Sequence, residues 1–271
     1  MNKLIQQLRR LYFLQEPSCP GHVDQALAQS PVGGNEVALD LVSPEGAVRA
    51  MVIGFERATD WELIAALHQG LQEDLELPLP AISVSASAGY QLWLSLAGDV
   101  PVAEAGLFLE ALRRKYLAAI PLANLSLLPD AKRSAVALVP ALHEASGKWS
   151  AFIDPSMGAM FVDEPGLDMA PNMDRQADML AGLESAKVAD FQRALAMLQD
   201  AAEADASLLE RTALPSAPEL GRLRSTLNVG NNFTDPKAFL LAVMNDPSAT
   251  AGQRIKAARA LLPYFNANGA E

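Results

Sequence analysis

Met51-Val52-Ile53-Gly54-Phe55-Glu56 is an apolar run that ends in a glycine, an aromatic residue and a carboxylate. Together with the residues from Ala47 onward, it has the length and composition of a buried strand. Residues 36–42 form a second strand candidate, and the turn residues 43–46 between the two runs favour a hairpin. Because side chains alternate along a strand, we expect residues 54 and 56 on the same face near its end.

The chain on either side of this run alternates between helical and strand patterns. Short apolar runs bounded by turn residues predict further strands, and apolar residues at helical spacing predict helices. The helices are expected at residues 4–14, 59–75 and 102–119, and the strands at 81–85, 90–96, 123–128 and 134–139. Strand hairpins that alternate with helices are typical of layered domains. The pattern predicts an α+β fold with a mixed sheet core and flanking helices.

The second half of the chain is expected to be helical. Residues 174–209 contain no proline, which favours one long helix or two in series, weakened at Gly182. Pro215-Ser216-Ala217-Pro218 is the best linker candidate, and residues 235–244 and 252–264 form two further helix candidates. We therefore divide the chain into an α/β domain at 1–165, a helical segment at 166–214 and a C-terminal two-helix module at 219–271.

Composition excludes several classes of protein. The 271 residues are 50% hydrophobic and 20% charged, which is typical of a globular chain. Cys19 is the single cysteine and excludes an internal disulfide. No apolar run reaches the roughly 18 residues of a membrane span. The N-terminal residues are too polar for a signal peptide, so we expect a cytoplasmic protein with no membrane partner.

Charge is unevenly distributed along the sequence. The net charge of −11 argues against a protein that coats nucleic acid by bulk electrostatics. Residues 151–210 carry twelve acidic and three basic side chains, whereas residues 222–265 carry six basic and two acidic ones. The C-terminal module is therefore the part of the chain best suited to contact phosphate.

A second motif is Ser83-Val84-Ser85-Ala86-Ser87-Ala88-Gly89-Tyr90-Gln91-Leu92-Trp93-Leu94. With the run at 51–56, it resembles the metal-binding and nucleotide-binding motifs of archaeo-eukaryotic primase and primase-polymerase domains of bacterial mobile elements. That family has Asp-hydrophobic-Asp in the first motif and Ser-x-Ser-Gly-x-Gly-x-His-hydrophobic-Trp in the second. Here Gly54 and Glu56 stand at the aspartate positions, and Gln91 stands at the histidine position.

A third stretch, residues 139–155, resembles the family segment in which a proline and a histidine precede a Ser/Thr-Gly-Lys/Arg turn and an apolar strand. The resemblance covers residues 11–155 and implies that Ser85, Ser87, Gln91, His143 and Lys148 contact nucleotide or phosphate. His143 has an alternative reading as a hydrogen-bonded turn residue. No confident counterpart of the third catalytic acid is present, and Asp130 and Asp154 are stand-ins by position only.

The residues that depart from the family pattern stand at the positions that the family uses for catalysis. Nucleotidyl transfer uses two metal ions held by carboxylates on adjacent strands. Gly54 supplies no ligand, Glu56 alone is a weak metal-ligand candidate, and Gln91 donates a hydrogen bond but cannot titrate. We therefore expect a degenerate site with no catalytic residues and no cofactor. Mg²⁺ or Mn²⁺ would bind only if the metal ligands are displaced to other positions.

The C-terminal residues 235–264 are similar to a helical element of phage terminase small subunits. Arg254, Lys256 and Arg259 are its candidate contacts to nucleic acid or to a partner protein. A helix pair that latches onto the core is the alternative.

These features lead to three functional hypotheses. The favoured one is a non-catalytic primase-like protein of a phage, plasmid or integrated element that acts in DNA replication or its control, with DNA or a replication protein as partner. The first alternative is an active primase or DNA polymerase with displaced metal ligands. The second is a pure protein-protein adaptor.

Overall fold

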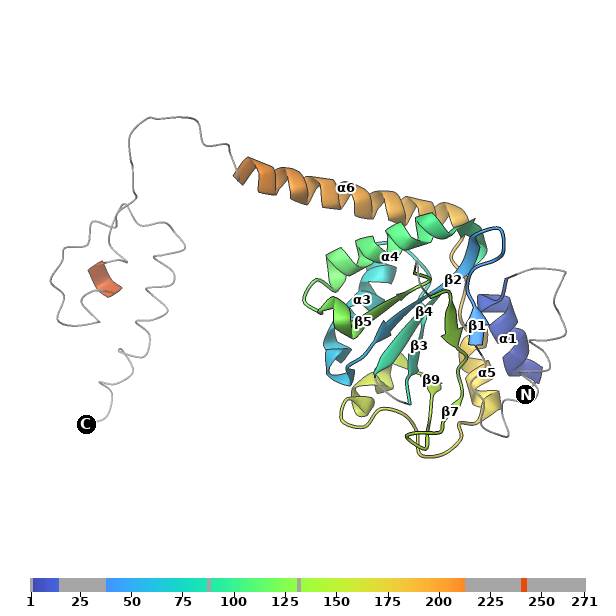
Figure 1. Cartoon of the computed structure of the whole chain (residues 1–271). Coiled ribbons are helices and arrows are strands. Elements are labelled where there is room, and N and C mark those ends of the chain that lie inside the picture. The colour runs from blue at the N-terminus through green and yellow to red at the C-terminus, as the bar shows by residue number, and fades with distance from the viewer. Residues whose placement is uncertain (1, 15–37, 87–88, 131–132, 213–239, 243–271) are drawn as a thin grey trace, which may run out of the picture. The chain divides into compact units, whose positions relative to one another are not determined.

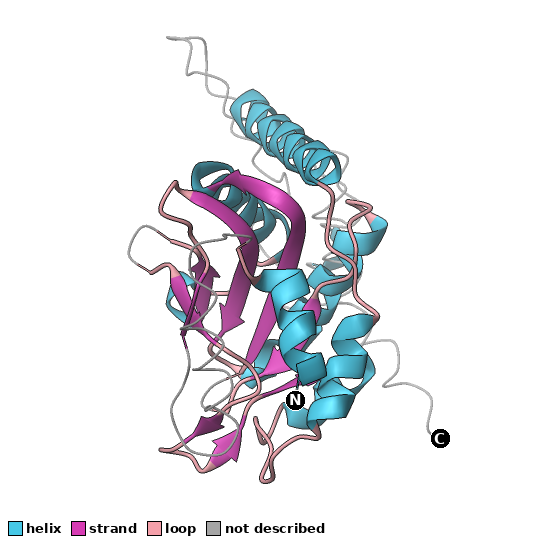
Figure 2. Ribbon diagram, turned by 90° about the vertical axis from the view of Figure 1, so that its right-hand side faces the viewer, coloured by secondary structure: helices cyan, strands magenta, loops and turns pink. Residues whose placement is uncertain are grey.

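The computed structural model describes residues 2–14, 38–86, 89–130, 133–212 and 240–242. The chain divides into two compact units, Met1–Ala213 and Leu214–Glu271. The first unit is an α+β domain, as the sequence predicted, with helices on both sides of a central sheet (Figures 1 and 2).

The central sheet has five strands in the order β5-β2-β4-β3-β9. All of its neighbouring strands run antiparallel. The strands are β2 (Ala47–Phe55), β3 (Ala81–Val84), β4 (Tyr90–Pro101), β5 (Leu125–Leu128) and β9 (Ala151–Ile153). The long strands β2 and β4 lie next to each other at the centre, because both are apolar enough to be buried on each face.

Helices α3 (Trp61–Glu73), α4 (Val102–Tyr116) and α6 (Val188–Thr212) pack on one face of this sheet. Figure 1 shows α6 running alongside α4, and the rings of Phe108 and Phe191 pack between these two helices with their centres 4.9 Å apart. The face of α3 expected to be apolar is confirmed, since Ile64, Leu67 and Leu71 are fully buried. These side chains join Met51, Ile53 and Phe55 of β2 in the larger core.

Helices α1 (Asn2–Tyr12) and α5 (Met173–Ala181) pack together against the opposite face. The expected apolar face of the first helix is confirmed by the burial of Leu4, Leu8 and Leu11. Arg49 of β2 is buried and donates to the backbone carbonyls of Phe13 at 2.8 Å and Arg10 at 3.0 Å. This guanidinium satisfies carbonyl groups at the end of α1 and fixes that helix on the sheet.

The prediction that residues 36–42 and 47–55 pair as a hairpin is wrong. Residues 43–46 do form a turn, with Gly46 at a φ of 78°, but only a bridge between Val42 and Val48 follows it. β1 (Ala38–Asp40) instead pairs with β6 (Ala135–Ala137), which the sequence had correctly placed as a strand. A further two-stranded sheet joins β7 (Leu142–His143) and β8 (Lys148–Trp149).

The helix expected from residue 59 begins as an α-helix only at Trp61. Residues Ala58–Asp60 form a 3-10 turn before the helix, and the Asp60 side chain makes no capping hydrogen bond. It is buried and accepts two hydrogen bonds from Arg57 instead, at 2.8 and 3.3 Å. The aspartate therefore fixes the segment that follows β2.

The helical stretch at 174–209 is two helices in series, and α5 ends directly before Gly182. Both helices pack on the sheet, so the described part of the helical segment expected at 166–214, residues 166–212, belongs to the same compact unit as the strands. The described part of this unit also contains 3-10 segments at Ala58–Asp60, Leu122–Asn124 and Pro155–Phe161. Of the C-terminal module, only residues 240–242 are described, and they are helical, within the helix expected at 235–244.

Candidate functional site

A row of polar and small side chains crosses four strands of the central sheet. Gly54 of β2 lies opposite Ser126 of β5 on one side and opposite Gln91 of β4 on the other. Gln91 in turn lies opposite Ser83 of β3. Two of the three departures from the family pattern, Gly54 and Gln91, are therefore direct cross-strand neighbours.

This polar row lies on the side of the sheet that carries α1 and α5. Strand side chains alternate, and Ile53 and Phe55 belong to the core under α3, α4 and α6. Val52 and Trp93, which flank the row along their strands, belong to the core under α1 and α5. The row therefore continues the α1/α5 face toward the end of β2, where apolar side chains give way to serine, glycine and glutamine.

A side chain at position 54 would meet the hydroxyl of Ser126 in this arrangement. A Cβ atom on Gly54 would press directly against Oγ of Ser126. An aspartate there requires the serine hydroxyl to rotate away first. The Ser126 hydroxyl thus occupies the place of a side chain at position 54.

Glu56 lies two residues after Gly54, directly after the end of β2, and its side chain is exposed. Its backbone N–H donates to the carbonyl of Asn124 at 3.0 Å, which continues the pairing of β2 with β5. Across the described ranges, no group of three or more His, Cys, Asp or Glu side chains is placed to hold a metal ion. Glu56 offers a single carboxylate at the end of the strand.

Gln91 is held by a hydrogen-bonded chain in the sheet. The fully buried Ser83 hydroxyl donates to Oε1 of Gln91 at 3.3 Å and accepts from the indole N–H of Trp93 at 2.9 Å. The amide nitrogen of Gln91 remains as a donor on the polar row. Trp93 is buried in the core, and its indole N–H orients the Ser83 hydroxyl toward Gln91.

Ser85 and Gly89 lie beside each other where β3 ends and β4 begins, next to the row. Ser85 is half-buried, and its backbone N–H donates to the carbonyl of Gly89 at 2.8 Å. A Cβ atom on Gly89 would collide with the backbone of residues 55–58, so only glycine allows this approach. The loop is therefore pressed against the segment that carries Glu56. Ser87, another predicted phosphate contact, lies outside the described residues.

The turn between β7 and β8 meets the same loop. Ser146 donates from its hydroxyl to the carbonyl of Ala86 at 2.8 Å. His143 contacts Ser146 through Nδ1, at 3.0 Å from the hydroxyl oxygen and at 3.3 Å from the backbone nitrogen. His143 is thus a turn residue that fixes the serine, which was its alternative reading.

Lys148 is already engaged in two ion pairs. Its Nζ lies 2.7 Å from Oε1 of Glu164 and 4.0 Å from Oδ1 of Asp168. The hydrogen bond from Lys148 lowers the pKa of the Glu164 carboxyl below its ordinary value. Lys148 is therefore paired with carboxylates of the same chain, and Ser146, two residues before it, makes the contact with Ala86.

The two stand-ins for a third catalytic acid serve local structure. Asp130 accepts from the backbone N–H of Arg133 at 2.7 Å. Asp154 accepts from both the backbone N–H and the hydroxyl of Ser156, which lowers the pKa of its carboxyl. Neither contact brings these carboxylates to Glu56.

The structure thus brings together most of the predicted site residues. Gly54 and Gln91 lie in one row, and Glu56 follows two residues after Gly54. The contact of Ala86 with Ser146 connects this end of the sheet to the turn that contains His143 and precedes Lys148. Sequence reasoning missed Ser83 and Ser126 as members of the row. Ser83 had a detectable signal, because it precedes Ser85 by two positions and thus shares its strand face. Arg254, Lys256 and Arg259 lie outside the described residues.

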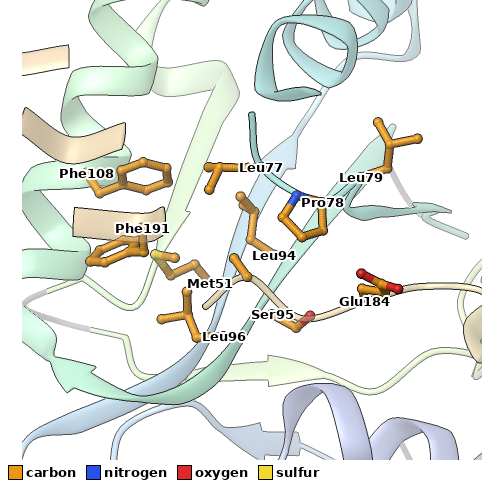
Figure 3. A pocket seen from close by; sticks show the side chains of 11 residues that line it. Met51, Leu77, Pro78, Leu79, Leu94, Ser95, Leu96, Phe108, Glu184 and Phe191 are labelled. Atoms are coloured by element: carbon orange, nitrogen blue, oxygen red, sulfur yellow. The ribbon is translucent and has the colours of Figure 1, made fainter. Parts of the chain in front are cut away.

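A separate hollow lies on the opposite face of the sheet, where α4 and α6 meet the segment after α3 (Figure 3). Met51, Leu94, Phe108 and Phe191 line it with apolar surface, and Glu184 stands at its rim. None of the predicted site residues lines this hollow.

No protein-family model matches the sequence, and no curated protein is significantly similar to it. Within the described part of the chain, no helix is long and apolar enough to cross a membrane.

Proposed function

We propose that this protein is a non-catalytic primase-like protein of a phage, plasmid or integrated element. In this proposal it acts in DNA replication or its control by binding nucleic acid or a replication partner. The observation that carries the proposal is the convergence of three separate sequence motifs. Residues 54–56, 83–91 and 143–148 are far apart in the sequence, yet cross-strand pairing and loop contacts join them at one end of the sheet.

The same arrangement favours binding over catalysis. Metal-assisted nucleotidyl transfer needs several carboxylates that converge on the ions. The row provides a glycine backed by Ser126, one exposed glutamate and a glutamine, which together offer hydrogen bonds and a single charge. Such groups are suited to recognise a polar ligand rather than to activate a metal-bound hydroxyl.

Primer synthesis is the experiment that separates this proposal from an active enzyme. We expect purified protein with Mg²⁺ or Mn²⁺ neither to start nor to extend a primer on a DNA template. Templated incorporation of labelled nucleotide that Glu56→Ala abolishes would show an active polymerase and overturn the proposal.

DNA binding is tested with a matched pair of lysine variants. Lys148→Gln should weaken binding to a fluorescent primer–template, because it removes the basic side chain beside the loop. Lys115→Gln removes a lysine that is likewise held by a carboxylate, Asp74, but lies on α4, and it should leave binding unchanged. Equal effects of the two variants would show that only bulk charge matters.

A protein adaptor is the second candidate, and one observation favours it. Lys148 and Arg57, the basic side chains closest along the chain to the converging motifs, are both held by carboxylates of the same chain. An adaptor requires no free cation for phosphate. Absence of salt-dependent DNA binding by the intact protein would make the adaptor the leading function.

A further inference from the structure

An acidic segment lies directly over the lysine of the candidate site. We use the name acidic arm for residues 162–168, which include the exposed side chains of Asp163, Glu164 and Asp168. Leu167 attaches this arm to β8 through two backbone hydrogen bonds with Trp149, of 2.7 and 2.9 Å. The arm therefore has a defined position beside Lys148.

A glycine allows the arm to approach so closely. Gly166 is buried and has a φ of 90°, which is unfavourable for residues with a side chain. A Cβ atom there would lie 3.1 Å from Cα of Ala86 and 3.1 Å from Cβ of Lys148. The arm thus contacts Ala86, the neighbour of Ser85, and it contacts Lys148; Ser85 and Lys148 are both expected to contact phosphate.

The carboxylates of the arm bind Lys148 where a phosphate would be expected to bind it. Glu164 places a carboxylate oxygen 2.7 Å from Nζ of Lys148, the distance at which a phosphate oxygen binds a lysine, and Asp168 adds a second carboxylate at 4.0 Å. The Glu164 and Asp168 side chains are 71% and 82% exposed, whereas the lysine side chain is only 21% exposed. Ion pairs of such exposed carboxylates are weak and exchangeable. A more highly charged anion can therefore replace them.

We propose that the acidic arm is an autoinhibitory contact, in which Glu164 and Asp168 compete with phosphate for Lys148. The competing phosphate belongs to a nucleoside triphosphate or to a DNA backbone, and it displaces the carboxylates when it binds. This inference rests on the proposed function, since it concerns control of the same site. It explains why Lys148, the basic side chain of the third motif, is paired with carboxylates of the same chain.

The test uses the intact chain and two isosteric changes on the arm. Glu164→Gln removes the carboxylate in contact with Lys148 and should tighten binding by about threefold to tenfold, the effect of one like charge removed near an anion. Asp163→Asn makes the same change in net charge on the same arm, without a contact to Lys148, and should alter the affinity less than about twofold by the weakness of exposed charges at longer range. Binding is measured by fluorescence anisotropy with single-stranded DNA and by calorimetry with metal-free deoxynucleoside triphosphate, so the source of the phosphate is distinguished.

The Lys148→Gln background supplies the decisive comparison. Autoinhibition predicts that Glu164→Gln has no further effect once the lysine is gone. Equal tightening by Glu164→Gln and Asp163→Asn, or tightening that persists in the Lys148→Gln background, would overturn the autoinhibitory contact. If the wild-type protein binds through Lys148 but Glu164→Gln changes nothing, only this inference fails. If no variant binds either ligand, binding of nucleic acid by this site fails with it, and the protein adaptor becomes the leading function.

Discussion

Two glycines in the domain have opposite surroundings, and these decide what a side chain does at each position. Gly89 is packed against the backbone of residues 55–58, which cannot move aside without disturbing β2. Gly106 lies in the middle of α4, and a Cβ atom added there would meet no other atom within 4 Å. The first glycine serves the close approach of two site segments, and the second only weakens a helix.

We therefore predict opposite effects of the same substitution. Gly89→Ala should lower the free energy of unfolding by about 1–3 kcal/mol, the usual range for overpacking. Gly106→Ala should raise it by about 0.5–1 kcal/mol, because alanine loses less chain entropy in a helix. Urea denaturation of both variants measures these changes. Equal effects of the two substitutions would contradict the close approach at Gly89.

At the scale of elements, a glutamine side chain acts as a substitute strand at one edge of the sheet. Gln176 of α5 accepts from the N–H of Phe152 at 2.7 Å and donates to its carbonyl at 2.9 Å. These bonds occupy the backbone groups that β9 would otherwise leave unpaired at the sheet edge. The pair also attaches α5 to the sheet.

Truncation of this side chain should be costly. Gln176→Ala leaves a buried N–H and a buried carbonyl without partners, so we expect a loss of about 2–4 kcal/mol in the free energy of unfolding. Gln69→Ala, which removes an exposed glutamine of α3, is the control and should change stability by less than about 0.5 kcal/mol. A small loss for Gln176→Ala would mean that water or another group replaces the amide.

His68 of α3 gives the domain a dependence on pH. Burial lowers the pKa of this imidazole, and within the described residues its Nε2 has no hydrogen-bond partner. The unfolded chain therefore takes up a proton more readily than the folded one as the pH falls below about 6.5. Stability should fall across this range and be unaffected by His68 above it.

The matched variant is His68→Gln, which cannot titrate. Its free energy of unfolding should decline less steeply than that of the wild type between about pH 7 and pH 5, the range in which an ordinary imidazole titrates. Parallel pH profiles of the two proteins would show that the imidazole is accessible to protons in the folded state.

Helices and strands with strong apolar patterns were predictable from the sequence. Which strands pair with one another was harder to predict. The buried faces of α1 and α3 follow from the spacing of leucines and isoleucine. The pairing of β1 with β6 does not, because it joins residues 38–40 to 135–137 across most of the domain and no local pattern encodes it. The site followed the same rule: Gly54 and Gln91 were recognised in their motifs, whereas Ser126 became visible only through the register of β5 with β2.

Over the whole molecule, charge separates the compact domain from the C-terminal residues. The chain carries −11 in total, yet residues 222–265 have six basic and two acidic side chains. A phosphate-binding role of this region predicts that DNA binding falls steeply with salt, because counterions are released on association. It also predicts that the domain folds without the region.

We therefore expect deletion of all residues after Pro218 to leave a folded domain that binds DNA less well. Neutralising Arg254, Lys256 and Arg259 together should reproduce most of that loss, since the other three basic side chains, Arg222, Arg224 and Lys237, lie at least 17 positions away along the chain. Thermal unfolding checks the fold, and anisotropy at several salt concentrations checks binding. Equal binding by the truncated and intact chains would make the region a latch or a protein-docking element.

The central claim is that the converging motifs form a binding site for nucleic acid that has lost its catalysis. Backbone hydrogen exchange of the intact protein, with and without a primer–template DNA, tests it most directly. The claim predicts slower exchange in residues 54–57, 85–91 and 142–149, with no comparable change on α3, on the opposite face of the sheet. Unchanged exchange in these three segments at a DNA concentration that saturates binding would contradict it.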